Sequence, residues 1–108
     1  MGVTEEQGKT AAIVGYLTII GALIAIFMNQ ESRNEFARFH IRQAFGLHLL
    51  YWLMGYFVGN LDIWMLHTAY WILFLTLWFY GFLGAVQKKW HTIPVIGPVF
   101  LKWFTFIQ

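Results

Sequence analysis

Three long runs without a charged residue limit what this chain can fold into. They cover residues 10–30, 43–61 and 63–87 and contain 21, 19 and 25 residues. A helix needs about 20 mostly apolar residues to cross the hydrocarbon core of a bilayer. Each run meets this requirement, so the sequence predicts three transmembrane helices. Their expected bounds are 10–28, 43–58 and 63–86.

The composition also indicates a membrane protein. Hydrophobic residues make up 59% of the 108 residues and charged residues 11%, whereas soluble domains carry about 25% charge. A soluble chain of this length has too little interior to bury so much apolar surface, which excludes a soluble globular domain. There is no cysteine, which excludes disulfides and thiolate metal sites. The net charge of +2 is too small and too scattered to indicate binding to nucleic acid.

The two ends of the chain differ from the three runs. Residues 1–9 form a polar N-terminal tail that lacks the basic start of a signal peptide, so we expect the first span to be retained. Residues 93–107 are apolar but too short to cross straight, and Pro94, Gly97 and Pro98 interrupt their start. They are typical of an interfacial or re-entrant helix, with a short tilted fourth span as the alternative. The predicted fold is a single all-α integral membrane domain.

Basic residues predict the orientation in the membrane. With three spans, Lys9 is the only basic residue on the side of the N-terminus. The other side would hold Arg33, Arg38, Arg42, Lys88, Lys89 and Lys102. Cytoplasmic segments carry the excess of Lys and Arg. We therefore expect the N-terminus outside, with the first loop and the segment after the third span inside.

Residues 31–42 form an amphipathic basic segment before the second span. On a helical wheel Glu31, Glu35, Arg38 and Arg42 fall within about 60° of one another. Such a face suits anionic lipid heads or a partner protein, and the alternative is a charged collar that anchors the helix at the interface. The candidate partner and lipid contacts are Arg38, Phe39, His40, Arg42 and Gln43.

His48 is an ionisable residue inside the second predicted span. Ionisable residues in membranes often mark function, yet a neutral histidine can also bind a backbone carbonyl. The sequence contains no paired carboxylates, no plausible catalytic triad and no helical metal spacing among its four histidines. We therefore predict no catalytic, cofactor or metal-binding residues, and a protein that is not an enzyme.

Small residues recur at four-residue spacing in the spans. Such pairs let helices approach closely, within one chain or between copies. The predicted packing positions are Gly55, Gly59, Gly81 and Ala85. A stripe of tryptophans follows one face of the third span and is typical of a lipid-facing or subunit contact; its members are Trp64, Trp71 and Trp78.

One segment resembles a known family. Phe36, Phe39, His40, Gln43 and Ala44 have the spacing of the F-x-x-F-H-x-x-Q-A signature found in the Tic-twenty-like family of small membrane proteins. That family is named for a subunit of the chloroplast inner-envelope import machinery. Three further segments agree with it, namely the turn at 28–31, the aromatic and glycine segment at 78–85, and the Ile-Pro-x-Ile-Gly element at 93–97.

The resemblance implies a helical protein of the bacterial inner (cytoplasmic) membrane that is a homologue of an import component. The family has no established catalytic residues. A shared role would fall on Phe39, His40, Gln43 and Ala44, with Arg38 and Arg42 beside them. Plastid members have four spans, whereas the fourth element of this chain is short and broken.

We therefore expect a non-enzymatic accessory or interaction subunit of a larger membrane complex. Its partners would be other membrane protein subunits and phospholipid, and protein translocation is the process that the resemblance suggests. The alternative is a small homo-oligomeric transporter or channel. Three short spans cannot enclose a pore alone, so this alternative requires self-association through faces such as Gly55 and Gly59.

Overall fold

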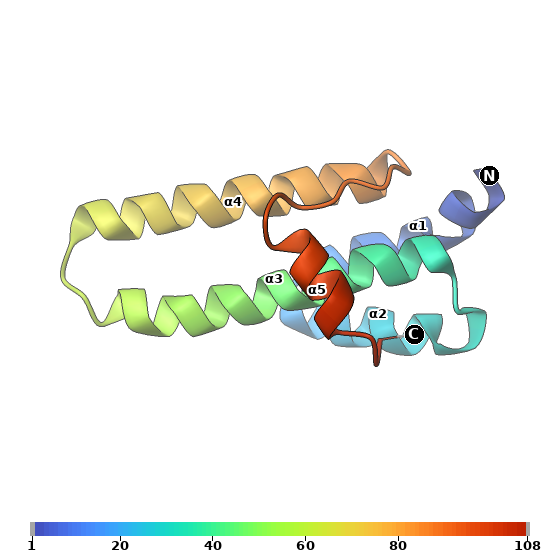
Figure 1. Ribbon diagram of the computed structural model, residues 1–108, viewed down its shortest axis with the longest axis horizontal. Coiled ribbons are helices and arrows are strands. Elements are labelled where there is room, and N and C mark those ends of the chain that lie inside the picture. The colour runs from blue at the N-terminus through green and yellow to red at the C-terminus, as the bar shows by residue number, and fades with distance from the viewer. Residues whose placement is uncertain (1, 108) are drawn as a thin grey trace.

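The computed structural model describes residues 2–107, and every regular element within that range is a helix. The helices are α1 (Gly2–Leu17), α2 (Ile19–Ser32), α3 (Glu35–Gly59), α4 (Trp64–Val86) and α5 (Gly97–Trp103) (Figure 1). The all-α prediction is confirmed.

Helices α3 and α4 form a long antiparallel hairpin on which the other helices are placed (Figure 1). With a rise of about 1.5 Å per residue, their 25 and 23 residues extend about 37 and 34 Å. Among the helices of residues 2–107, α4 alone is both long and apolar enough to cross a membrane, with a mean hydropathy of 1.7. Only 28% of that apolar window is buried, so most of α4 faces outward.

The first predicted span, residues 10–28, is not one helix in the structure. The chain breaks at Thr18, which has extended backbone angles, and the Thr18 hydroxyl accepts a hydrogen bond of 3.0 Å from the Gly21 N–H. Threonine is a favoured residue at this position because its oxygen satisfies a free N–H at the start of a helix. The 16 and 14 residues of α1 and α2 extend only about 24 and 21 Å. This run forms a helical hairpin, so the prediction of three spans is not confirmed.

Side chains of α3 and α4 supply the hydrogen bonds that the break at Thr18 leaves open. The last carbonyls of a helix have no partner within that helix. The His48 Nε2–H donates to the Gly15 carbonyl over 3.1 Å, and the Trp78 indole donates to the Tyr16 carbonyl. His48 thus binds a backbone carbonyl, which is one of the two roles that the sequence left open for it.

The α1–α2 hairpin returns the chain to the end of the molecule at which α3 begins (Figure 1). There the Trp90 indole donates to the Glu5 carboxylate over 2.8 Å, and the Lys88 ammonium lies 3.6 Å from a Glu6 oxygen. The N-terminal residues therefore lie beside the segment that follows α4. The prediction that placed them on opposite sides of a membrane assumed that residues 10–28 cross once, and these contacts do not support that assumption.

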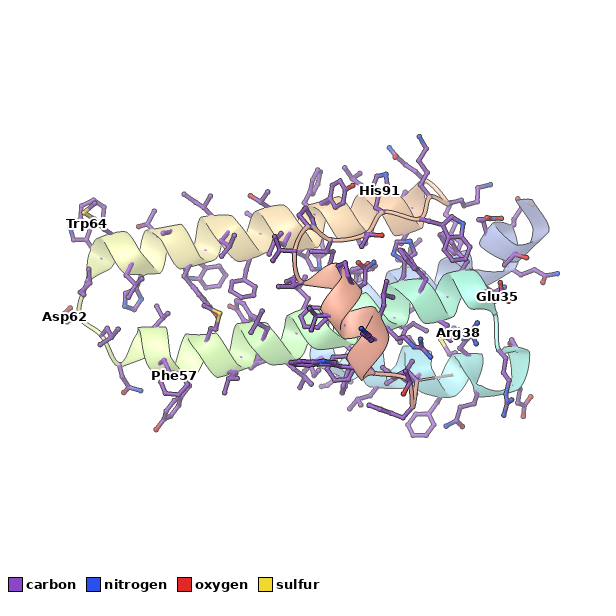
Figure 2. All side chains as sticks on the ribbon, viewed as in Figure 1. Glu35, Arg38, Phe57, Asp62, Trp64 and His91 are labelled. Carbon is purple, nitrogen blue, oxygen red and sulfur yellow. The ribbon has the colours of Figure 1, made fainter. Side chains whose placement is uncertain are left out.

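The long axis of the molecule has a polar end and an outer end. All charged residues except Asp62 belong to the segments 5–9, 31–42 and 88–102. Figure 2 shows Glu35 and Arg38 toward one end and Asp62, in the α3–α4 turn, at the other. We call the first the polar end and the second the outer end.

The predicted amphipathic segment, residues 31–42, and the predicted second span, residues 43–58, are not separate elements. Most of both belongs to α3, which begins at Glu35 after the Asn34 side chain accepts a hydrogen bond of 3.0 Å from the Ala37 N–H. The continuous helix carries polar side chains from the polar end directly into its apolar part.

Helix α5 is shorter than the predicted helix over residues 93–107 and covers Gly97–Trp103. It packs on α3 at Gly46, where the absence of a side chain lets the two elements approach closely. A Cβ atom at Gly46 would lie 2.4 Å from the Phe100 ring, so the aromatic ring sits directly on the helix backbone. This contact fixes α5 across the middle of α3 (Figure 1).

The turn before α5 stores backbone strain at Val95. Its φ is 67°, and the Ile96 N–H donates to the Pro94 carbonyl over 2.7 Å, which closes a three-residue turn that is rare for a branched residue. The Val95 side chain is 87% exposed, so it offsets little of this strain by packing.

We expect Val95→Gly to raise the stability of the protein by about 1 kcal/mol, because glycine adopts positive φ without a steric cost. The measurement is the thermal unfolding midpoint of the protein in detergent. Val99→Gly, in α5, is the matched control and should lower the midpoint, because glycine weakens a helix. A lower midpoint for Val95→Gly would contradict the strain at this turn.

Candidate functional site

After α4 the chain returns across α3 as a C-terminal strap, residues 87–107, and polar side chains of α3 hold this strap. Gln43 is fully buried. Its Nε2 donates to the His91 carbonyl over 2.9 Å, and its Oε1 accepts from the Ile93 N–H over 2.6 Å. One amide side chain thus pairs with two backbone groups of the non-helical part of the strap.

His40 makes a second contact with the strap, and this contact fixes its tautomer. Its Nε2 lies 2.8 Å from the Lys89 carbonyl, which can only accept, so Nε2 carries the hydrogen. Nδ1 is then the acceptor for the Tyr16 hydroxyl at 2.8 Å. Burial lowers the pKa of His40 to about 4, because the charged ring would be removed from water. His40 is therefore a neutral link between α1, α3 and the strap.

Arg42 holds the end of the strap. Its Nε, Nη1 and Nη2 donate to the carbonyls of Ile107, Leu101 and Thr105 over 3.1, 3.2 and 3.3 Å. The planar guanidinium presents five N–H groups in a fixed fork, so it can serve several carbonyls at once. These carbonyls lie in and just after α5, where helix geometry leaves acceptors unpaired.

These contacts change the interpretation of three predicted site residues. The hydrogen-bonding groups of His40, Arg42 and Gln43 were predicted to meet an external partner or lipid, whereas the structure places them on this chain's own strap. The side chains of His40 and Gln43 are fully buried. Sequence reasoning could identify polar residues that need partners, but it could not identify the strap as the partner.

Arg38 and Phe39 lie nearer the surface. Arg38 lies 4.0 Å from Glu35, and both side chains are partly exposed, so this pair contributes little to stability. The Phe39 ring meets the Trp90 ring edge to face with centroids 5.1 Å apart. Arg42 is also partly exposed, so these two residues and Arg42 keep a surface that a partner or lipid can reach.

The predicted packing positions lie at contacts within the chain, with one exception. A Cβ atom at Gly55 would lie 2.7 Å from the Tyr70 hydroxyl, and one at Gly81 would lie 2.8 Å from the Tyr16 ring. Ala85 is fully buried. Gly59 has no atom within 4 Å of a Cβ built on it, so it is open to the surroundings.

The half of the α3–α4 hairpin near the outer end is not covered by α1, α2 or α5 (Figure 1). Large apolar side chains on it are exposed (Figure 2). We call this part of the hairpin the outer half, and its exposed apolar residues include Trp52, Leu53, Tyr56, Phe57, Trp64, Met65, Trp71 and Ile72. Soluble monomers rarely expose an apolar surface of this extent, and such surfaces mark contacts with membranes or proteins.

Two cavities lie along this hairpin. The outer groove, of about 450 Å³, runs between α3 and α4 and is lined by residues such as Tyr51, Tyr56 and Tyr70. The break cavity, of about 280 Å³, lies where the α1–α2 break meets the hairpin and includes His48. The two cavities share Tyr51, Trp52 and Trp71. Sequence reasoning missed both, because each depends on residues from distant segments.

No metal site forms among the described residues, since no three His, Asp or Glu side chains in that part of the chain gather to hold an ion. Comparisons with protein-family models, with curated proteins and with solved structures find no match to this chain. The resemblance of residues 36–44 to the Tic-twenty-like signature therefore stays a prediction.

The low pKa of His40 predicts how stability depends on pH. His40 lies at the polar end, before the predicted crossing segment of residues 43–58. The unfolded histidine takes up a proton near pH 6.5, whereas the folded one does so only near pH 4. The stabilisation is complete above pH 6.5 and is lost as the pH falls toward 4. The loss is about 3 kcal/mol, since one pKa unit corresponds to about 1.4 kcal/mol.

The measurement is the unfolding midpoint in detergent between pH 4 and 8. His40→Gln should flatten the part of this profile between pH 4 and 6.5, because glutamine can keep both hydrogen bonds without titrating. His67→Gln, on the exposed part of α4, is the matched control and should keep the slope of the unmodified protein. If the slope of His40→Gln equals that of the control, His40 is not the group responsible.

Proposed function

We propose that the chain is an integral membrane protein in which α3 and α4 cross the bilayer and the α1–α2 hairpin enters it without crossing. The length and hydropathy of α4 support this proposal. The placement of Glu35 and Arg38 at the polar end, opposite Asp62, supports it too (Figure 2). In lipid each backbone polar group needs an internal partner, and the hydrogen bonds from His48 and Trp78 meet this need at the break.

This topology puts the N-terminus, the first loop and the strap on one side of the membrane. The side holds the basic residues of the chain, so the positive-inside rule makes it the cytoplasmic side. Trp103 is 71% exposed beside Lys102, and tryptophan beside lysine is typical of an interfacial anchor in contact with phospholipid. The bacterial inner membrane is proposed on the family resemblance alone.

The proposed role is that of a non-enzymatic accessory subunit that binds another membrane protein through the outer half. The observation that carries this proposal is the outer groove, of about 450 Å³ between two helices with exposed aromatic side chains. Helices associate in membranes through close packing, because lipid tails are as apolar as the side chains. A helix of a partner that fills this groove would gain contacts that α3 and α4 do not make with each other.

A link to protein translocation is part of the proposal and depends on the resemblance of residues 36–44. The positions that carry this resemblance bind the strap in the structure. We therefore assign partner binding to the outer half and the assembly of the fold to the signature residues.

The proposed topology can be tested by cysteine labelling, because the chain contains no cysteine of its own. Single cysteines at Gln7, Gln30 and Asn60 would occupy exposed positions. We expect a membrane-impermeant maleimide to label Gln7→Cys and Gln30→Cys from the same side, and Asn60→Cys from the other. Labelling of Gln7→Cys and Gln30→Cys from opposite sides would contradict the proposed topology and would show that residues 10–28 cross the membrane once.

The proposed partner surface can be tested by photocrosslinking in the native membrane. A photoreactive amino acid at Phe57, on the outer half, should give crosslinks to other membrane proteins at a several-fold higher yield than the same residue at Phe27. Both side chains are more than half exposed, and Phe27 lies on α2. Equal yields at the two positions would contradict the assignment. Products that contain only copies of this chain would favour the homo-oligomeric transporter or channel.

A further inference from the structure

The break cavity has the features of a small-molecule site rather than of a gap between helices. The α1–α2 break at Thr18 forms one wall, with Tyr51 of α3 and Trp71 and Phe74 of α4 among the others. Its volume of about 280 Å³ is large enough for an aromatic ring. Ligand sites are mostly apolar and aromatic, with a small number of placed polar groups that orient the ligand.

His48 provides the placed polar group. Its Nε2–H is committed to the Gly15 carbonyl at 3.1 Å. The neutral ring therefore has a lone pair on Nδ1, and His48 makes no other hydrogen bond within the described residues. Because the hydrogen bond to α1 fixes the tautomer, Nδ1 can accept a hydrogen bond from a bound ligand.

The remaining walls favour an aromatic ring. The Tyr51 ring makes edge contacts with Trp71 and Phe74, with centroids 5.7 and 5.6 Å apart. Ring pairs prefer such edge and offset arrangements. The Trp78 indole N–H already donates to the Tyr16 carbonyl, so it does not compete for the same ligand atom as His48.

We infer that the break cavity binds a lipid-soluble phenol, the ring of which lies among Tyr51, Trp71 and Phe74 while its hydroxyl donates to His48 Nδ1. The alkyl tail of the ligand leaves through the open side of the cavity into the surrounding lipid. This site adjoins the outer groove and shares Tyr51, Trp52 and Trp71 with it, whereas His48 belongs to the break cavity and not to the outer groove. The proposal does not rest on partner binding at the outer half.

The test uses two probes that differ only in a methyl group, which replaces the hydroxyl hydrogen. 4-Octylphenol donates a hydrogen bond, whereas 4-octylanisole has the same ring and tail but cannot donate. Each labelled probe is equilibrated with the full-length protein in lipid nanodiscs, and empty nanodiscs give the partition into lipid. We expect saturable binding of one 4-octylphenol per chain, with about tenfold weaker binding of 4-octylanisole, which is the effect of one hydrogen bond.

His48→Phe should lower the affinity for the phenol to that for the anisole. His67→Phe is the matched control, because His67 also donates from Nε2 to a backbone carbonyl, that of Leu61, and lines the outer groove. It should change neither affinity. Should His48→Phe fail to fold, the ¹⁵N chemical shift of His48 Nδ1 in the unmodified protein gives the answer, since it moves when the phenol binds. Equal affinities of the two probes, non-saturable uptake, an unmoved shift, or loss of binding in His67→Phe alone would each overturn the proposal.

Discussion

The structure depends on one constraint, which is that backbone polar groups placed away from water need partners inside the molecule. Regular helices meet this constraint by themselves, but this chain leaves helix geometry at the break at Thr18 and in the part of the strap before α5, residues 87–96. At the break, the indole of Trp78 and the imidazole of His48 bind the last carbonyls of α1. Along the strap, side chains of α3 make most of the hydrogen bonds, from His40, Arg42 and Gln43. Helix α3 is therefore both a long apolar helix and the polar support for the two irregular segments.

This double role of α3 explains why a short signature can contain so many polar residues. His40 and Gln43 lie within one turn of each other and bind successive backbone groups of the strap, at Lys89, His91 and Ile93. Loss of one such side chain would leave a buried carbonyl or N–H without a partner, which costs about 1–3 kcal/mol. The residues that resemble the Tic-twenty-like signature thus have a structural explanation in this chain. That explanation requires no external ligand at His40 or Gln43.

The sequence predicts the parts of this fold that local signals determine. The predicted third span, residues 63–86, agrees with α4 to within one residue, because Asp62 and Lys88 limit its apolar run. The predicted second span lies wholly inside α3. The break at Thr18 could not be predicted in the same way, since no charged residue interrupts the run around it. The side chains that stabilise the break are 33 and 62 residues away from their acceptors. The partners of His40 and Gln43 are likewise about 50 residues distant, so composition and helical periodicity contain no information about them.

The division between the two halves of the hairpin supports the proposal that a partner binds the outer half. At the polar end, the side chains of His40, Arg42 and Gln43 donate hydrogen bonds to carbonyls of the strap. A partner could bind these donors only if it displaced the strap. On the outer half the tryptophan side chains are exposed, and the groove between α3 and α4 is lined by residues of these two helices and not by α1, α2 or the strap. In lipid, exposure of these rings has little cost, because lipid and side chain are both apolar. Stability therefore does not require the outer half to be covered, and its surface is free to match a partner.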